Sequence, residues 1–335
     1  MNIIIDAFGG DHAPLEVLRG SRRAVKELGV SMTLAGNREK IQRCAEENGI
    51  SLDGISILDA PAVFDIHEEP TSLLKQHTDT SLAVGMQALR DGKGDAFVCA
   101  GSTGALLVGA TFLVKRIPGI KRAAAAPVLP TEKTPFMLID GGANTDCRPE
   151  MLVQFAIMGS AYMQNVMHVE CPRVALLNVG AEETKGRELE LEAYRLLEQA
   201  PVHFIGNVEA RELPAGAADV VVTDGFTGNV ALKLYEGMGK FLAHQLKGNL
   251  FAGVSGKLAA LLILPRIKKL TKKMDYKAVG GAVMLGVQKP VIKAHGSSDG
   301  TAFFNAIRQA RDCVAGNVVQ TITETVSHTA KQKEA

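Results

Sequence analysis

The sequence has no tryptophan, no long apolar run and no strong excess of charge of either sign. Its longest apolar run, Leu258 to Leu264, is far shorter than the roughly 20 residues that a membrane-spanning helix needs. The formal net charge is +1, so the composition gives no electrostatic support for a nucleic-acid partner. The first residues also lack the basic and apolar regions of a signal peptide. We therefore expect a cytoplasmic protein.

Fingerprints of several common enzyme classes and metal sites are missing as well. The five cysteines are an odd number without C-x-x-C spacing, which indicates neither a disulfide framework nor a structural zinc site. There is no G-x-G-x-x-G, no Walker loop, no G-x-S-x-G and no H-E-x-x-H. We therefore expect neither a metal nor a cofactor.

Short, continuous apolar runs alternate with segments of helical periodicity along the 335 residues. Continuous apolar strands separated by helices predict an α/β fold, with a largely parallel, doubly wound sheet covered on both faces. The runs near 125–139 are close enough to form a hairpin, which would make the sheet mixed. No linker appears, so residues 1–335 are expected to form a single α/β catalytic unit. The predicted strands are 3–6, 32–34, 55–58, 96–99, 125–129, 136–139, 174–177, 202–205, 220–223 and 290–293.

Several of these strands end in short polar loops that contain glycine. In open α/β sheets ligands bind beyond the carboxyl ends of the strands, where backbone amides are available. Amides, hydroxyls and glycines at such positions suit an oxyanion or a phosphate group. The alternative is that these side chains only cap helices and turn the chain. The candidate residues are Gly101, Ser102, Thr103, Gly104, Asp140, Asn144, Asn178, Asp224, Thr227, Asn229, His295 and Ser297.

Lys185 lies in a loop that follows the strand 174–177 and precedes a helix rich in glutamate. A cation at a strand end can meet an anionic substrate. The alternative is a surface ion pair between Lys185 and Glu188, Glu190 or Glu192, which is the commoner fate of a loop lysine.

These motifs together resemble one family, the acyl-carrier-protein-dependent phosphate acyltransferases of bacterial phospholipid synthesis (PlsX). The resemblance covers nearly the whole chain in the expected order. Two positions depart from it: Phe8 stands where methionine is expected, and Ser102 where asparagine is expected. The matching segments are Asp6 to Asp11, Ala100 to Ala105, Asp140 to Asn144, Asn178 to Gly186, Thr223 to Asn229, and Gly280 to Ala282 through Ala294 to Ser298.

The resemblance implies a fold like those of the phosphotransacetylases and the isocitrate and isopropylmalate dehydrogenases. It also implies a homodimer that converts an acyl carrier thioester and inorganic phosphate to acyl phosphate and free acyl carrier protein. The product would pass to a downstream membrane acyltransferase. By similarity, Lys185 and Asn229 are the first candidates for catalysis.

The chemistry of this reaction asks little of a general base. By analogy with phosphate monoesters, whose second pKa is about 6, much of the phosphate is already dianionic at pH 7, and a thiol of pKa about 8.5 is a fair leaving group. What remains is to hold two reactants together and to stabilise the tetrahedral oxyanion. We assign Lys185 to the phosphate and transition-state charge, Asn229 to orientation, the amides of 101–104 to anion binding, and His295 to a proton shuttle. Transfer is expected to be direct, because no nucleophile with an adjacent base is apparent.

Residues 237–278 form a basic segment, and 250–274 within it has apolar residues at largely helical spacing. From Gly237 to Met274 there is no acidic residue, while eight lysines and arginines fall in this stretch. We expect an amphipathic helical insertion that contacts the membrane peripherally, the acidic carrier protein or the second protomer. A core-facing apolar stripe with a solvated basic face is the alternative.

Three other functions remain open on the sequence. They are a phosphotransacetylase-like enzyme that uses a coenzyme A thioester, a metal-dependent 2-hydroxy-acid dehydrogenase on the same fold, and a non-catalytic membrane scaffold. Fold alone does not separate them. The missing nucleotide fingerprint disfavours the dehydrogenase, and the many polar strand-end loops disfavour the scaffold.

Overall fold

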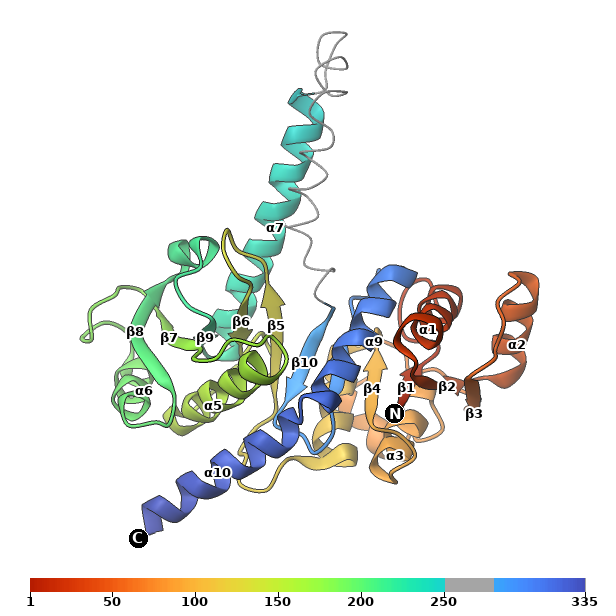
Figure 1. The fold of residues 1–335 in the computed structure, drawn as a ribbon, viewed down its shortest axis with the longest axis horizontal. Coiled ribbons are helices and arrows are strands. Elements are labelled where there is room, and N and C mark those ends of the chain that lie inside the picture. Colours follow the sequence, from red (N-terminus) through yellow and green to blue (C-terminus); the bar gives the residue numbers. More distant parts are fainter. Residues whose placement is uncertain (251–279, 335) are drawn as a thin grey trace.

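The computed structural model describes residues 1–250 and 280–334. Within this part, eleven strands form one sheet in the order β3-β2-β1-β4-β11-β10-β5-β6-β9-β7-β8 (Figure 1). The strands are β1 (Asn2–Asp6), β2 (Ser31–Gly36), β3 (Ile55–Asp59), β4 (Ala96–Cys99), β5 (Ala124–Leu129), β6 (Phe136–Ile139), β7 (Arg173–Asn178), β8 (His203–Glu209), β9 (Val220–Val222), β10 (Ala282–Leu285) and β11 (Val291–Lys293).

The sheet consists of two parallel halves joined by an antiparallel segment. Strands β3, β2, β1, β4 and β11 are parallel to one another, and so are β6, β9, β7 and β8. Between the halves, β10 is antiparallel to β11 and β5, and β5 is antiparallel to β6. The prediction of a largely parallel but mixed sheet is therefore confirmed, including the hairpin of β5 and β6. Strand β10 was not predicted.

Helices cover both faces of the sheet. They are α1 (Leu15–Leu28), α2 (Arg38–Glu47), α3 (Ser81–Arg90), α4 (Thr103–Gly109), α5 (Pro149–Asn165), α6 (Glu188–Glu198), α7 (Gly225–Leu250), α9 (Gly300–Ala315) and α10 (Val318–Glu334), with the shorter turns η1 (Pro70–Leu74), η2 (Ala110–Lys115) and η3 (Ala210–Ala215).

Side chains that alternate along β1 explain how the two faces acquire separate cores. Ile3 and Ile5 face the core that α1 and α9 cover, whereas Ile4 faces the core that includes residues of α3 and α4. The first of these cores continues into the second half of the sheet through α5, where Phe155 and Tyr162 are fully buried. The two halves therefore share apolar packing as well as hydrogen bonds.

Helix α7 departs from this compact arrangement and rises away from the sheet (Figure 1). Its first turns pack on β6, but it carries a stripe of exposed apolar side chains at a spacing of three or four residues. The exposed fraction of Leu234 in this stripe is 65%. We call these residues the α7 stripe: Phe226, Val230, Leu234, Met238 and Phe241.

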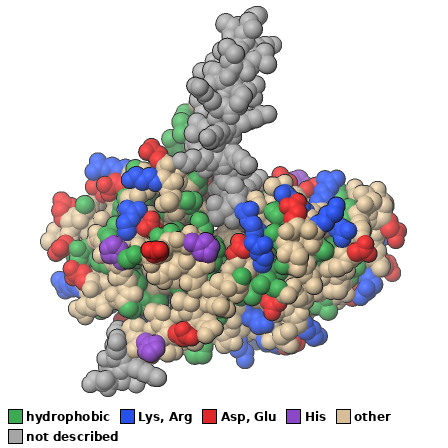
Figure 2. All heavy atoms as spheres, viewed as in Figure 1, with side chains coloured by type: hydrophobic (Ala, Val, Ile, Leu, Met, Phe, Trp, Pro, Cys, Tyr) green, Lys and Arg blue, Asp and Glu red, His purple; other side chains and the backbone are tan. Residues whose placement is uncertain are grey.

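No helix among the described residues is both long and apolar enough to cross a bilayer. The predicted docking segment 250–274 lies outside the described residues apart from Leu250, and the insertion 237–278 is described only as far as the end of α7. On the face drawn in Figure 2, acidic and basic side chains are interspersed over both halves of the molecule, in agreement with the small net charge.

Candidate active site

The loops that follow β1, β4 and β11 meet at one edge of the first half of the sheet. The Asp11 amide donates to the Gly296 carbonyl at 2.8 Å, which ties the first loop to the third. Gly9 lies against the second loop, where a Cβ atom would be only 2.8 Å from the Gly101 nitrogen. Glycine is therefore required there for the loops to approach so closely. We call these three loops the first loop group.

Beneath the first loop group lies a buried acid and thiol pair. The Cys99 thiol donates to Asp6 Oδ2 at 3.2 Å, and the Gly101 amide donates to Cys99 Sγ at 3.1 Å. Burial raises the pKa of Asp6 and, more strongly, that of the Cys99 thiol. Both groups point into the protein, so they fix the loop 101–104 rather than face a substrate.

Lys293 ends β11 and places its ammonium group against the first loop group. Its Nζ donates to the carbonyl oxygens of Ala100 at 3.2 Å and Ala294 at 2.6 Å. Burial lowers the pKa of Lys293. The nearby Cys99 and Asp11 act in the opposite direction, and the charge of Lys233 on α7 adds to the lowering. Lys233 belongs to the second half of the molecule, so charges from both halves act on the Lys293 ammonium.

The predicted residues of the first loop group have these positions. Ser102 caps α4, because its Oγ accepts from the Ala105 amide at 3.3 Å, and Thr103 is exposed. His295 Nδ1 accepts from the Ser297 amide at 3.1 Å and lies 2.9 Å from Ser297 Oγ. In its neutral form the His295 ring therefore carries its proton on Nε2.

In the second half of the sheet, Asp140 organises the loop that follows β6. Its Oδ1 accepts from the amides of Ala125, Gly142 and Ala143 at 3.0 to 3.1 Å. Its Oδ2 accepts from the Asn144 amide at 2.7 Å and from Asn144 Nδ2 at 2.8 Å. Burial raises the pKa of Asp140, and these hydrogen bonds oppose that shift. With five donors around it, the carboxylate is fully occupied by the protein.

Asp224 plays a corresponding part in the loop after β9. It accepts from the Thr227 amide at 2.9 Å and from Thr227 Oγ1 at 2.8 Å, and an ion pair joins it to Arg187 Nη2 at 2.7 Å. Although burial alone would raise its pKa, the bonds from Thr227 and Arg187 outweigh it and lower the pKa of Asp224. Arg187 also forms an ion pair with Glu190. Through its ion pair with Asp224, Arg187 holds the loop after β7 next to the loop after β9.

Close backbone packing joins the loops of Asp140 and Asp224. A Cβ atom on Gly228 would lie 1.9 Å from the Asp140 carbonyl oxygen, so no side chain fits there. The next residue, Asn229, is exposed. A Cβ atom added to Gly142 would lie 3.1 Å from the Cβ atom of Asn229, so this residue lies close to the loop after β6. The loops after β6, β7 and β9 form the second loop group.

Lys185 lies in the loop after β7, two residues before Arg187. The Asn178 side-chain amide donates to the Lys185 carbonyl at 3.0 Å and so holds the loop against the strand end. Within residues 1–250 and 280–334 the Lys185 ammonium makes no ion pair, and Glu190, one of its expected surface partners, pairs with Arg187 instead. The side chain of Lys185 is exposed.

The structure thus brings the predicted residues together in two groups. Gly101 to Gly104, His295 and Ser297 lie in the first, and the predicted residues from Asp140 to Asn229 lie in the second. The sequence prediction missed Lys293, Arg187 and the pair of Asp6 with Cys99. Lys293 could have been recognised as a candidate from the sequence, because it ends a predicted strand directly before a candidate loop. The described residues contain no group of three or more His, Cys, Asp or Glu arranged to hold a metal ion.

Comparison with known proteins gives matches along the whole chain. The sequence profile of the family described as "Fatty acid synthesis protein" matches residues 1–321. The chain is 46% identical over 332 residues to a phosphate acyltransferase of Geobacillus thermodenitrificans, covering 98% of this chain and 100% of the relative. It is 45% identical over 335 residues to a phosphate acyltransferase of Oceanobacillus iheyensis, covering both chains completely.

Solved structures that resemble this fold include two phosphotransacetylases. One, from Streptococcus pyogenes, has a TM-score of 0.65 and 16% identity, covering 94% of each chain. The EutD phosphotransacetylase from Staphylococcus aureus has a TM-score of 0.63 and 18% identity, covering 93% of this chain and 94% of the other. These identities are low, so the likeness confirms the predicted fold and nothing further.

Proposed function

The chain belongs to the PlsX family of phosphate acyltransferases, enzymes of fatty acid and phospholipid synthesis, and we propose that it transfers the acyl group of an acyl carrier thioester to inorganic phosphate. The observation that carries the proposal is the full-length match to curated phosphate acyltransferases. The two loop groups, which expose amides, hydroxyls and cations at strand ends, support it.

In the proposed reaction, a phosphate oxygen attacks the carbonyl carbon of the thioester. The tetrahedral intermediate collapses, the carbon–sulfur bond breaks, and the carrier thiolate leaves with the electron pair and then takes up a proton. Much of the phosphate is already dianionic at neutral pH, so the protein must mainly hold the reactants and stabilise negative charge. No covalent enzyme intermediate is required.

Lys185 and Lys293 are the proposed cations of the site. The ammonium of Lys185 has no partner among the described residues and lies on a loop that Arg187 anchors to Asp224. Lys293 uses two of its three donor hydrogens on carbonyl oxygens, which leaves one for an anion. A fixed cation next to a developing oxyanion stabilises the transition state more than the ground state.

Asn229, His295 and the loop 101–104 complete the proposed site. We propose that the exposed Asn229 amide orients phosphate or the thioester carbonyl. The loop 101–104 is proposed to bind an anion through its backbone amides, apart from that of Gly101, which donates to Cys99 Sγ. His295 is proposed as a proton shuttle for the leaving thiol. Asp140, Asp224 and Thr227, which the sequence suggested as substrate ligands, have their side chains engaged with the protein, so their contribution to binding would be to hold the loops.

The main alternative to the proposed function differs from it in the acyl donor. A phosphotransacetylase-like enzyme would use a coenzyme A thioester, and the shared fold does not choose between donors. The purified protein should therefore be given long-chain acyl carrier thioester or acyl-coenzyme A, with and without phosphate. Hydroxylamine trapping of acyl phosphate that depends on phosphate and on the carrier supports the proposal. Thiol release without phosphate would show a thioesterase instead.

The proposed partners are the acyl carrier protein, a second protomer and, after release of the product, a membrane acyltransferase. The α7 stripe supports a homodimer, because a large exposed apolar patch usually marks an interface. Leu234→Glu should convert a dimer to a monomer in analytical ultracentrifugation, whereas Lys233→Glu on the same turn serves as the charge control. Peripheral membrane contact through 250–274 and a cytoplasmic location remain predictions from the sequence.

A further inference from the structure

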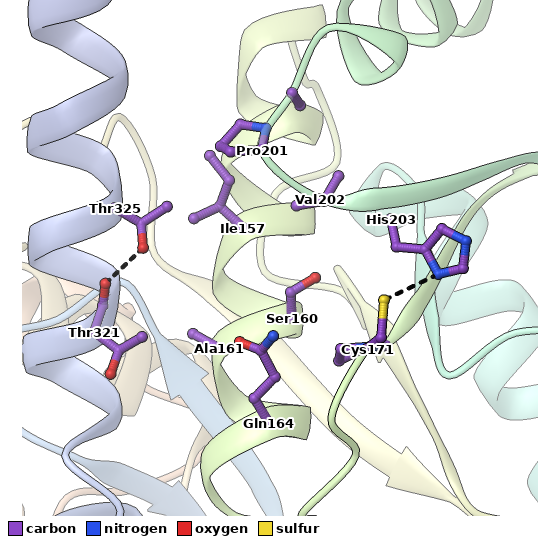
Figure 3. A pocket seen from close by; sticks show the side chains of 12 residues that line it. Ile157, Ser160, Ala161, Gln164, Cys171, Pro201, Val202, His203, Thr321 and Thr325 are labelled. Atoms are coloured by element: carbon purple, nitrogen blue, oxygen red, sulfur yellow. Dashed lines mark hydrogen bonds between the residues drawn. The ribbon is translucent and has the colours of Figure 1, made fainter.

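A groove of about 400 Å³ is drawn in Figure 3. It lies at the amino ends of β7 and β8, whereas the proposed reaction site lies at the carboxyl ends of the strands. Helices α5 and α10 form one side, and the chain entering β7 and β8 forms the other. Cys171 lies two residues before β7, whereas Asn178 ends the same strand on the reaction side. The lining includes no Lys, Arg, Asp or Glu, so the groove favours an uncharged group.

A thiol and an imidazole lie together in this groove. Cys171 Sγ is 3.4 Å from His203 Nδ1, within hydrogen-bonding range for sulfur, as the dashed line in Figure 3 marks. An imidazole that accepts the thiol proton produces a thiolate, which is the nucleophilic form of cysteine. Cys171 is also the exposed cysteine of the chain: three others are buried, and Cys44 is partly buried.

Ser160 adds an independent observation on the facing helix. It is only 8% exposed, lines the groove, and its Oγ has no hydrogen-bond partner in the described structure. Figure 3 shows its side chain on α5 directed to the side of Cys171 and His203. A buried hydroxyl without a partner costs about 1–3 kcal/mol, so a ligand that supplies an acceptor would recover this free energy.

From these observations we propose that Cys171 is an acyl-accepting thiol, which the acyl phosphate product of this enzyme converts to a thioester inside the groove. The inference rests on the proposed function, because that reaction supplies the activated acyl group. A nucleophile, its neighbouring base and a hydroxyl without a partner all belong to residues that line the groove, and the apolar side chains of Ile157, Ala161 and Val202 line it as well and can contact an acyl chain. The open side of the groove leaves the charged phosphate in water.

The step balances without any further reactant. His203 Nδ1 takes the thiol proton, and the Cys171 sulfur attacks the carbonyl carbon of the acyl phosphate. The oxyanion of the tetrahedral intermediate accepts the hydrogen of Ser160 Oγ. The bond between the carbonyl carbon and the phosphate oxygen then breaks, phosphate leaves with the electron pair, and the imidazolium gives its proton to phosphate or water. The products are a thioester on Cys171 and inorganic phosphate.

The test uses the full-length protein and octanoyl phosphate, with S-octanoyl pantetheine as a parallel thioester arm. Intact mass and peptide mapping should show one octanoyl group on Cys171, removable by neutral hydroxylamine, formed at least about tenfold faster than on Cys44. His203→Ala should slow its formation by roughly a hundredfold, as the loss of a general base does, and Ser160→Ala should slow it as well. Cys171→Ser should abolish the adduct, and Cys44→Ser should leave it unchanged.

Equal labelling of Cys171 and Cys44, or a rate indifferent to His203→Ala, would overturn the inference. Labelling by the thioester alone would also overturn it, because the acyl phosphate would not be the donor. Phosphate-dependent acyl phosphate formation by Cys171→Ser is measured in parallel. If that activity is normal while wild type acquires no adduct, only this inference fails; if wild type forms no acyl phosphate, the proposed function fails.

Discussion

Replacement of Asp140 by asparagine tests whether this carboxylate organises a loop or binds the substrate. In the native protein three amides donate to Oδ1, and the Asn144 amide and side chain donate to Oδ2. An asparagine at 140 offers one oxygen and one NH2 group. If its oxygen keeps the three amide bonds, its NH2 group faces the two Asn144 donors, and both of those hydrogen bonds are lost.

The size of the effect follows from the type of bond. A hydrogen bond to a charged group contributes about 1.5–3 kcal/mol, so losing two of them at a buried site should lower the free energy of unfolding by about 3–6 kcal/mol. That is a large part of the roughly 5–15 kcal/mol typical of a folded protein. Activity should fall with the loss of the loop.

Denaturant unfolding followed by circular dichroism measures this change, with Asp146→Asn as the control. Asp146 is an exposed carboxylate in the same loop and has no hydrogen bond or ion pair in the described structure, so its unfolding free energy should change by less than about 0.5 kcal/mol. If Asp140→Asn left stability unchanged but altered the KM for phosphate severalfold, the carboxylate would act on the substrate, and the reasoning above would be refuted.

Three further predictions concern the charged groups of the site. Lys185→Ala should lower kcat/KM by roughly a hundredfold with folding retained. Lys133→Ala, the control at an exposed lysine in the same half, should leave kcat/KM unchanged. Near-normal turnover of Lys185→Ala would mean that Lys185 is only a surface residue. Lys293→Met should raise the KM for phosphate at least about tenfold. It should also lower the unfolding free energy by about 1–3 kcal/mol, because the hydrogen bonds to two carbonyl oxygens are lost. An unchanged KM for phosphate in steady-state assays would contradict the proposed role of Lys293. Because folding lowers the pKa of Asp224, its stabilising effect is present above its unfolded pKa of about 3.9 and is lost as pH falls through the lower native value. The unfolding free energies of wild type and Asp224→Asn, measured by denaturant unfolding at a series of acidic pH values, should therefore converge as pH falls.

The sequence predicted the place of the site because that place follows from topology. Once 136–139 and 220–223 are recognised as buried strands, the polar residues after them must lie at strand ends. The loops of Asp140 and Asp224 therefore come together as expected. Strand β10 was not predicted, because Ala282–Leu285 is short and follows two glycines, and only its pairing with β5 and β11 gives it the form of a strand.

The roles of individual side chains were less predictable, since their partners come from distant parts of the chain. Asp140 receives a donor from Ala125 on the neighbouring strand, and Arg187 reaches Asp224 across 37 residues of sequence. Nothing local distinguishes Arg187 from Lys185, two cations in one loop. One of them turns inward to an aspartate and the other does not, and this difference depends on tertiary packing.

The arrangement of these charges is compatible with the proposal that a site rich in carboxylates accepts a dianion. An uncompensated negative charge about 4 Å from phosphate would cost about 4 kcal/mol at an effective dielectric constant near 20. Asp140 avoids this through its five protein donors, and Asp224 through Arg187 and Thr227. The two carboxylates are thereby used to fix loop backbones, and Lys185 and Lys293 are the cations that we propose meet the substrate. Removing Arg187 should therefore damage the site twice, by releasing the loop of Lys185 and by exposing the charge of Asp224 to phosphate.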